Sequence, residues 1–161
     1  IPFGRSIMAD AKPKMIVQYT LNGESISHAR TDIETRDVDV TIDEPTQRGG
    51  TNMGLTPTET LVAALIGCTN VIGQRAGEKH GVHFEDLTVD ALADFDRRGV
   101  MFEEEIEIPF PKIVLTIKGK SDVDDATLEK VKTDLAKFCP IAKVIRASGT
   151  VIEEIWEISK P

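Results

Sequence analysis

The middle of the chain, residues 56–77, reads TPTETLVAALIGCTNVIGQRAG, and this stretch predicts one long helix. Thr56 suits the cap, Pro57 suits the first helical position, and Glu59 completes a capping box. From position 61 to position 72 the helix is apolar on nearly all sides. A helix of this kind is buried in a core or at an interface between subunits. The other elements are therefore expected to pack around it.

The segments before this helix predict strands. Residues 16–21 and 25–30 flank Asn22-Gly23, the strongest two-residue hairpin signal, and residues 37–42 alternate apolar and polar positions. The glycine-rich stretch that follows, residues 48–54, contains neither a GxGxxG pattern nor a Walker lysine. It therefore does not predict a phosphate-binding loop.

The second half of the chain continues with strands and shorter helices. A hairpin is expected from two alternating runs, residues 87–95 and 100–108, with a turn over residues 96–99. The elements expected after it are a strand at 113–117, a helix up to Phe138, a short helix at 141–147 and a strand at 151–158. This order predicts an α+β domain with mostly antiparallel pairing.

Length and composition limit the classes of protein to which this chain could belong. The 161 residues are expected to form one domain at 8–161, preceded at 1–7 by vector-derived residues before Met8. A net charge of −8 and 5% aromatic residues disfavour nucleic-acid binding. The longest apolar stretch, residues 61–68, is far shorter than the roughly 20 residues of a membrane-spanning helix. With no apolar core of a signal peptide, we expect a reducing, cytoplasmic environment.

The two cysteines are the candidate reactive residues. Cys68 lies in the apolar helix, where a small buried side chain without chemistry is the common alternative. Cys139 precedes Pro140 at the expected start of a helix, where the dipole and free N–H groups favour a thiolate, although a cysteine at such a position is more often an inert cap residue. Only the fold could bring together two residues so far apart in sequence. The histidines form no metal-binding pattern, so neither a metal site nor a cofactor is expected.

Two motifs carry a family resemblance. Residues 54–69 and 138–144, each with one cysteine, resemble the OsmC/Ohr superfamily of osmotically inducible and organic hydroperoxide resistance proteins. Asp43-Glu44-Pro45, Gly49-Gly50 and the order of elements extend the resemblance over nearly all of residues 15–158. It implies an intertwined homodimer, in which antiparallel sheets wrap two long central helices that lie back to back.

The resemblance also implies a function in oxidative-stress defence. Cys68 would attack a hydroperoxide as a thiolate and become a sulfenic acid, Cys139 would condense with it to a disulfide, and a dithiol reductant would restore both thiols. In this family an arginine stabilises the thiolate. Arg30 is the best match by its distance from Pro45, and Arg36 is second. The alternative for each arginine is an exposed charge on a strand.

One position departs from the family pattern. The peroxidase branches have a glutamate directly after the helix-starting proline, where this chain has Thr58. Glu59 follows one position later, about 100° further around the helix, and is better explained by the capping box. The alternative function is a non-catalytic dimer that binds a small hydrophobic or thiol ligand in its dimer groove, with Cys68 inert. A purely structural dimer is a third possibility.

Overall fold

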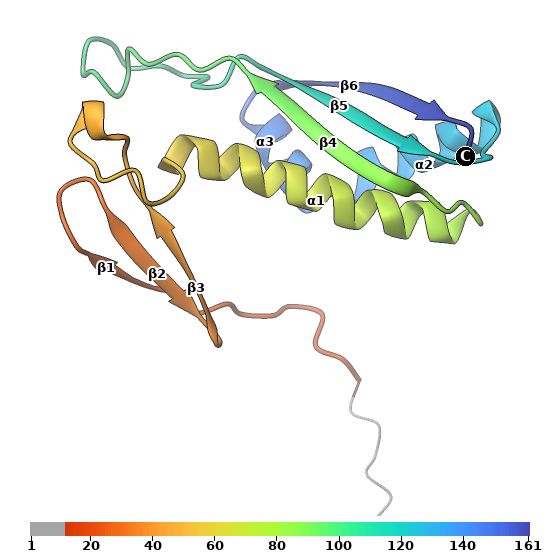
Figure 1. Ribbon diagram of the computed structural model, residues 1–161, viewed down its shortest axis with the longest axis horizontal. Coiled ribbons are helices and arrows are strands. Elements are labelled where there is room, and N and C mark those ends of the chain that lie inside the picture. Colours follow the sequence, from red (N-terminus) through yellow and green to blue (C-terminus); the bar gives the residue numbers. More distant parts are fainter. Residues whose placement is uncertain (1–11) are drawn as a thin grey trace, which may run out of the picture. The chain divides into compact units, whose positions relative to one another are not determined.

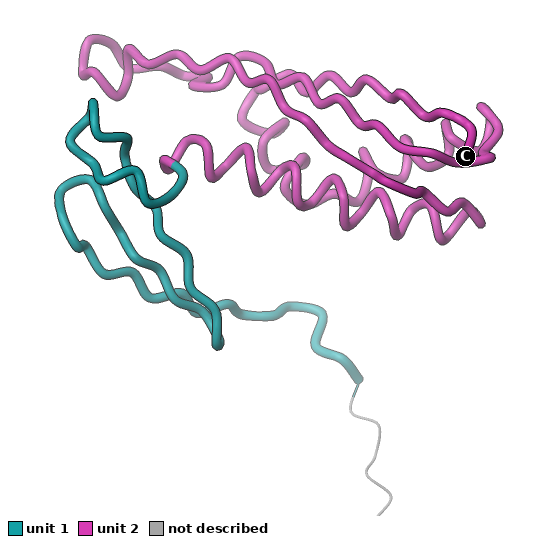
Figure 2. Tube along the Cα trace, viewed as in Figure 1, with its two compact units in different colours: residues 1–55 teal, residues 56–161 magenta. Residues whose placement is uncertain are grey.

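The structure is a computed structural model that describes residues 12–161 (Figure 1). The chain divides into two compact units, unit 1 up to Leu55 and unit 2 from Thr56 onward (Figure 2). The expected vector-derived segment, residues 1–7, lies outside the described residues. The single domain at 8–161 stays a prediction.

Unit 1 contains an antiparallel sheet of three strands in the order β1-β2-β3, followed by a short 3-10 helix. Their bounds are β1 (Asn22–Ser25), β2 (Thr31–Thr35), β3 (Val38–Ile42) and η1 (Thr46–Arg48). The hairpin turn predicted at Asn22-Gly23 is wrong, because these residues open β1. The chain reverses after β1, where the Ser27 hydroxyl accepts hydrogen bonds from the backbone N–H groups of Ala29 and Arg30. The Ser27 hydroxyl satisfies these turn donors locally, which supports a reversal after β1 instead of at Asn22-Gly23.

A buried carboxylate organises the glycine-rich stretch of unit 1. Asp43 is fully buried and accepts hydrogen bonds from the backbone N–H of Glu44, Thr51 and Met53 and from the Thr51 hydroxyl. These bonds hold the pKa of Asp43 below its ordinary value, the Thr51 hydroxyl most of all. At Gly50 a Cβ atom would collide with the carbonyl oxygen of Glu44. This glycine therefore allows close backbone packing.

Unit 2 begins with the long helix that the sequence predicts, α1 (Pro57–Lys79). Its capping box is confirmed, since the Thr56 hydroxyl accepts the Glu59 N–H at 3.2 Å and the Glu59 carboxylate accepts the Thr56 N–H at 2.9 Å. The remaining elements are β4 (Glu85–Ala93), β5 (Lys112–Lys120), α2 (Asp125–Phe138), α3 (Pro140–Ala147) and β6 (Val151–Ser159). The sheet order is β4-β5-β6, antiparallel between β4 and β5 and parallel between β5 and β6. The α+β class and the mostly antiparallel pairing are confirmed.

The strand predicted at residues 100–108 is wrong. β4 pairs directly with β5, and the intervening residues 94–111 form turns and irregular chain. Polar contacts stabilise this segment, because the Arg98 guanidinium binds the carboxylates of Asp96 and Glu104 at 2.6 and 2.9 Å. The apolar side chains of Val100 and Phe102 are exposed, so their alternation covers no core.

The core of unit 2 lies between the sheet and the three helices (Figure 1). Ile113, Leu115 and Ile117 alternate along β5 and are buried against Leu65 of α1. α1 is not covered on all sides, because Leu61 is 39% exposed and Val71 is 46% exposed. The expected burial of α1 on nearly all sides is therefore not met within unit 2. Among the described helices, none is long and apolar enough to cross a membrane.

Candidate active site

The fold of unit 2 brings the two cysteines together. The Sγ atoms of Cys68 and Cys139 lie 2.9 Å apart, although 71 positions separate them in sequence, and both thiols are free. A disulfide has an S–S distance of about 2.05 Å. The two sulfurs are therefore in direct contact without being bonded.

Helix packing accounts for this contact. Cys68 lies on the side of α1 that packs against the core cluster around Leu65, and this cluster also includes Cys139. Cys139 ends α2, where its N–H donates to the carbonyl of Leu135 at 3.0 Å. It also caps α3, where its sulfur accepts the N–H of Ala142 at 3.5 Å. Pro140 at the first position of α3 fixes this break between the two helices.

The two sulfurs have different surroundings. Cys68 is half-buried, whereas Cys139 has no exposed surface. Burial raises the pKa of Cys139 to about 11, and its contact with Cys68 adds to the shift. The expectation that the helix start favours a thiolate at Cys139 is therefore wrong, because desolvation outweighs the N–H bond from Ala142. At neutral pH the buried Cys139 therefore keeps its proton.

Arg30 lies in unit 1, just before β2. Its Nε and Nη2 atoms donate to the two carboxylate oxygens of Asp32 at 2.8 and 2.9 Å, and the Thr41 hydroxyl donates to the same carboxylate at 3.0 Å. This hydrogen-bonded pair raises the pKa of Arg30 and lowers that of Asp32. Sequence reasoning missed Asp32. Its spacing of two residues from Arg30 was the available signal, because alternate residues of a strand project to the same side.

Arg36, the second candidate, has a local structural role. It is the first of the two residues that join β2 to β3, and its φ angle is +54°. A residue in this left-handed region is typical of tight hairpin turns. The backbone of Arg36 therefore forms part of the turn between β2 and β3, and this role does not depend on the charge of its side chain.

The carboxylate of Glu59 is occupied by the helix start. One of its oxygens, Oε2, accepts the N–H of Thr56, as the capping box requires. The Thr58 hydroxyl lies 3.2 Å from that of Thr56. The start of α1 therefore has three threonine hydroxyls, those of Thr56, Thr58 and Thr60, and one carboxylate, which takes part in the capping box.

A second cluster of polar residues links the ends of two helices of unit 2. Lys79 and His80, at the end of α1, each lie 2.8 Å from the carboxylate of Asp134 on α2. These contacts lower the pKa of Asp134, and the hydrogen bond from Lys79 contributes most to this shift. The three residues connect α1 to the helix that leads to Cys139. Among the residues that the structure describes, no group of three or more His, Cys, Asp or Glu could hold a metal ion.

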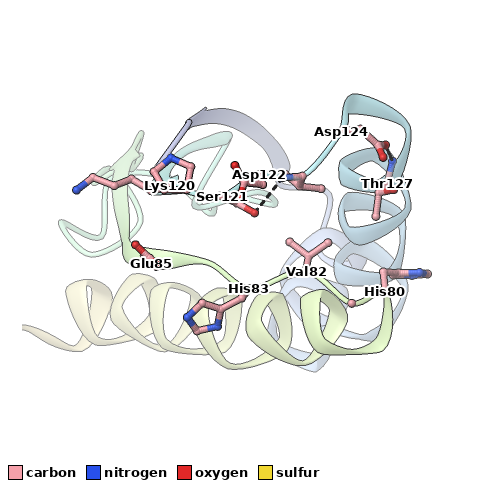
Figure 3. Close-up of a pocket in the computed structure, with 12 residues that line it drawn as sticks. His80, Val82, His83, Glu85, Lys120, Ser121, Asp122, Asp124 and Thr127 are labelled. Carbon is pink, nitrogen blue, oxygen red and sulfur yellow. Dashed lines mark hydrogen bonds between the residues drawn. The ribbon is translucent and has the colours of Figure 1, made fainter.

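A polar cavity of about 450 Å³ lies where the α1–β4 turn faces the start of α2 (Figure 3). His83, Lys120 and Asp122 are among its lining residues, and neither cysteine is. Part of the lining serves the start of α2, since Asp124 accepts the N–H of Thr127 at 2.7 Å. The cysteine pair therefore remains the stronger candidate site.

Comparison with known proteins identifies a family and a fold. A family model described as OsmC-like protein matches residues 49–154. No curated protein matches the chain.

Several solved structures resemble the chain over most of its length. An OsmC-like protein from Mycoplasma pneumoniae has a TM-score of 0.75 at 14% identity, covering 90% of this chain and 99% of that one. A hypothetical protein from Aquifex aeolicus has a TM-score of 0.70 at 20% identity, covering 91% and 99%. An organic hydroperoxide resistance protein OsmC from Legionella pneumophila has a TM-score of 0.60 at 14% identity, also covering 91% and 99%. At these identities the likeness shows a common fold.

Proposed function

Because this chain belongs to the family of OsmC-like proteins, we propose that it reduces organic hydroperoxides with Cys68 and Cys139 as a redox pair. The observation that carries this proposal is the 2.9 Å contact between two free thiols. Contact between the sulfurs allows a disulfide to form with little movement of the backbone. The physiological role would be defence against oxidative stress in the cytoplasm.

The proposed cycle begins at Cys68, the sulfur that solvent reaches. Its thiolate attacks the terminal oxygen of R–O–OH, the O–O bond breaks, and RO⁻ leaves and takes up a proton to become an alcohol. Cys68 is then a sulfenic acid. The thiol of Cys139 condenses with it, which forms the S–S bond and releases one water molecule.

The cycle closes with a dithiol reductant. Two thiols of the reductant are oxidised to a disulfide while the Cys68–Cys139 bond is reduced to two thiols, so the electrons balance. Because Cys139 has no exposed surface, it is suited to the internal step and not to a first encounter with peroxide. No cofactor takes part in these steps.

We assign Arg30 the role of stabilising the Cys68 thiolate. A guanidinium favours a nearby negative charge, and it does so better when its own position is fixed. The two hydrogen bonds to Asp32 fix the Arg30 side chain. This assignment rests on the family resemblance of the sequence around Pro45.

The proposed molecule is a homodimer. The partly exposed apolar side chains of α1, Leu61 and Val71 among them, leave a surface that a second copy would cover. In unit 1, Val38 and Val40 on β3 are also about half exposed, at 46% and 49%. Apolar surface of this extent on both units favours association.

Counting free thiols tests the proposed cycle. One equivalent of an organic hydroperoxide should consume both thiols of the wild-type chain, release one equivalent of alcohol, and be reversed by a dithiol. Cys68→Ser should leave the peroxide unconsumed, and Cys139→Ser should stop at a sulfenic acid that a dimedone-type reagent traps. Peroxide consumption that persists in Cys68→Ser would eliminate the redox proposal and favour the alternative, a dimer that binds a hydrophobic or thiol ligand.

A further inference from the structure

The two sulfurs of the proposed disulfide differ in how a thiol reductant can reach them. We infer that the reductant attacks the sulfur of Cys68, so that the mixed disulfide forms at Cys68 and Cys139 is the thiol released first. This inference rests on the proposed function, because the disulfide is the oxidised form in that cycle. It goes further, because the cycle alone does not say which sulfur the reductant meets.

The direction of attack decides which sulfur can react. Thiol–disulfide exchange proceeds by attack of a thiolate on one sulfur of the disulfide. In this displacement the attacking sulfur enters opposite the sulfur that leaves. Attack at Cys68 therefore comes from the side away from Cys139, and attack at Cys139 would come from the side away from Cys68.

Burial closes the approach to Cys139. Its side chain has no exposed surface and belongs to the same core cluster as Leu115, Leu135 and Ile145. An attacking thiol would have to displace part of this core to reach the far side of Cys139. Cys68 packs against the cluster but is only half-buried. A thiol in solution can therefore reach Cys68 while the core stays intact.

The leaving sulfur weighs against attack at Cys68, but less than access does. A thiol of lower pKa leaves faster, and burial raises the pKa of Cys139 to about 11 against an ordinary value of 9.0. This difference slows the expulsion of Cys139 by roughly tenfold to a hundredfold. A core residue, however, is reached only in molecules that open locally, which are roughly one in a thousand or fewer. Access therefore decides the site of attack.

The start of α3 assists the sulfur that leaves. The N–H of Ala142 donates to the sulfur of Cys139 at 3.5 Å. Because this donor and the helix dipole are already in place, they stabilise the negative charge that develops on Cys139 as the bond breaks. The released sulfur then takes up a proton, since its pKa lies well above neutral pH.

Each bond change with a dithiol reductant follows from attack at Cys68. The first thiolate of the reductant bonds to the Sγ of Cys68, the Cys68–Cys139 bond breaks, and its electron pair stays on Cys139. The second thiol of the same reductant loses its proton and attacks the reductant sulfur in the mixed disulfide, which releases Cys68. The reductant leaves as a disulfide, and its two electrons have reduced both cysteines.

Mapping the mixed disulfide tests the inference on the wild-type chain. Diamide closes the Cys68–Cys139 bond without peroxide, and excess glutathione then opens it briefly before acid stops the exchange, because only thiolates attack. Digestion with pepsin in acid and mass spectrometry show which cysteine carries glutathione. We expect at least about tenfold more glutathione on Cys68 than on Cys139, as the different access requires. Glutathione on Cys139, or equally on both, would overturn the inference.

The unfolded chain is the matched control. In concentrated urea both sulfurs are exposed, so glutathione should be shared about equally between them. An excess on Cys68 that persisted in urea would also overturn the inference, because burial would then not direct the attack.

The same samples separate this inference from the proposed function, because none of these steps needs peroxide. A chain that glutathione opens at Cys68 but that consumes no hydroperoxide would refute the proposed function alone. A chain that consumes hydroperoxide but carries glutathione on Cys139 would refute this inference alone. A chain in which diamide closes no bond would overturn both.

Discussion

At the scale of single residues, solvent access gives the two cysteines different chemistry. Cys139 has no exposed surface and keeps its proton, whereas Cys68 is half-buried. Oxidation beyond the sulfenic acid requires further peroxide to reach the sulfur. In Cys139→Ser, where no disulfide can form, excess hydroperoxide should therefore oxidise Cys68 further, whereas in the wild-type chain the disulfide should protect it.

The two candidate arginines have different local surroundings, and their substitution should separate them. Arg30→Gln should lower kcat/KM for hydroperoxide reduction by about tenfold, which corresponds to the loss of about 1.4 kcal/mol of thiolate stabilisation. Arg36→Gln is the matched control and should leave kcat/KM unchanged, because Arg36 lies in the β2–β3 turn. Steady-state rates for both variants test the assignment. If kcat/KM fell only in Arg36→Gln, Arg36 and not Arg30 would be the residue that stabilises the Cys68 thiolate.

The raised pKa of Cys139 predicts a loss of stability in alkaline solution. The pKa of this thiol is about 11 in the fold against an ordinary value of 9.0, so above pH 9 the unfolded chain releases the proton while the folded chain retains it. Stability contributed by this group is therefore complete below pH 9 and falls as pH rises toward 11, by roughly 1–3 kcal/mol. Cys139→Ala lacks the titrating group and should show a smaller decrease. Urea unfolding at pH 8 and pH 10.5 makes the comparison, and parallel decreases would contradict it.

At the scale of elements, the start of α1 supports the helix that holds Cys68. Thr56→Ala removes the side chain that accepts the Glu59 N–H, and Thr56 is only 4% exposed. We expect a decrease of about 1 kcal/mol in the free energy of unfolding and a Tm lower by about 2–4 °C. Thr56→Ser retains the hydroxyl and should stay close to wild type. Thermal unfolding of the two variants side by side tests the capping box.

Local sequence signals predicted α1 well, because capping residues act on the helix that directly follows them. The alternating run at residues 100–108 misled the prediction, since alternation makes a strand only where another layer covers its apolar face, and Val100 and Phe102 remain exposed. The parallel β5–β6 pairing was missed because it depends on how α2 and α3 cross between the strands. The contact between the sulfurs of Cys68 and Cys139 could not be predicted from local sequence either, because it depends on how α1, α2 and α3 pack together.

At the scale of the whole molecule, the exposed side of α1 is the feature that predicts association. We expect the protein to be a dimer at micromolar concentration, because an interface built on central helices buries roughly 2,000 Å² or more. Val71→Asp places a charge on this side and should shift the mass toward that of a monomer. Val144→Asp, at an exposed valine of α3, is the matched control and should leave the dimer intact. Light scattering measures both, and a monomeric wild type would contradict the prediction.

The distance in sequence between the two sulfurs has a thermodynamic consequence. Cys68 and Cys139 are 71 positions apart, so a bond between them would close a large ring in the unfolded chain and reduce its entropy. By the usual relation for cross-linked chains this favours the folded state by up to about 4 kcal/mol. The oxidised protein should therefore unfold at a higher temperature than the reduced one. Calorimetry of the two redox forms would show it, and Cys139→Ser should show no difference after the same treatment. Each turnover would then alternate the protein between a less stable reduced form and a more stable oxidised form, so peroxide would raise its resistance to unfolding.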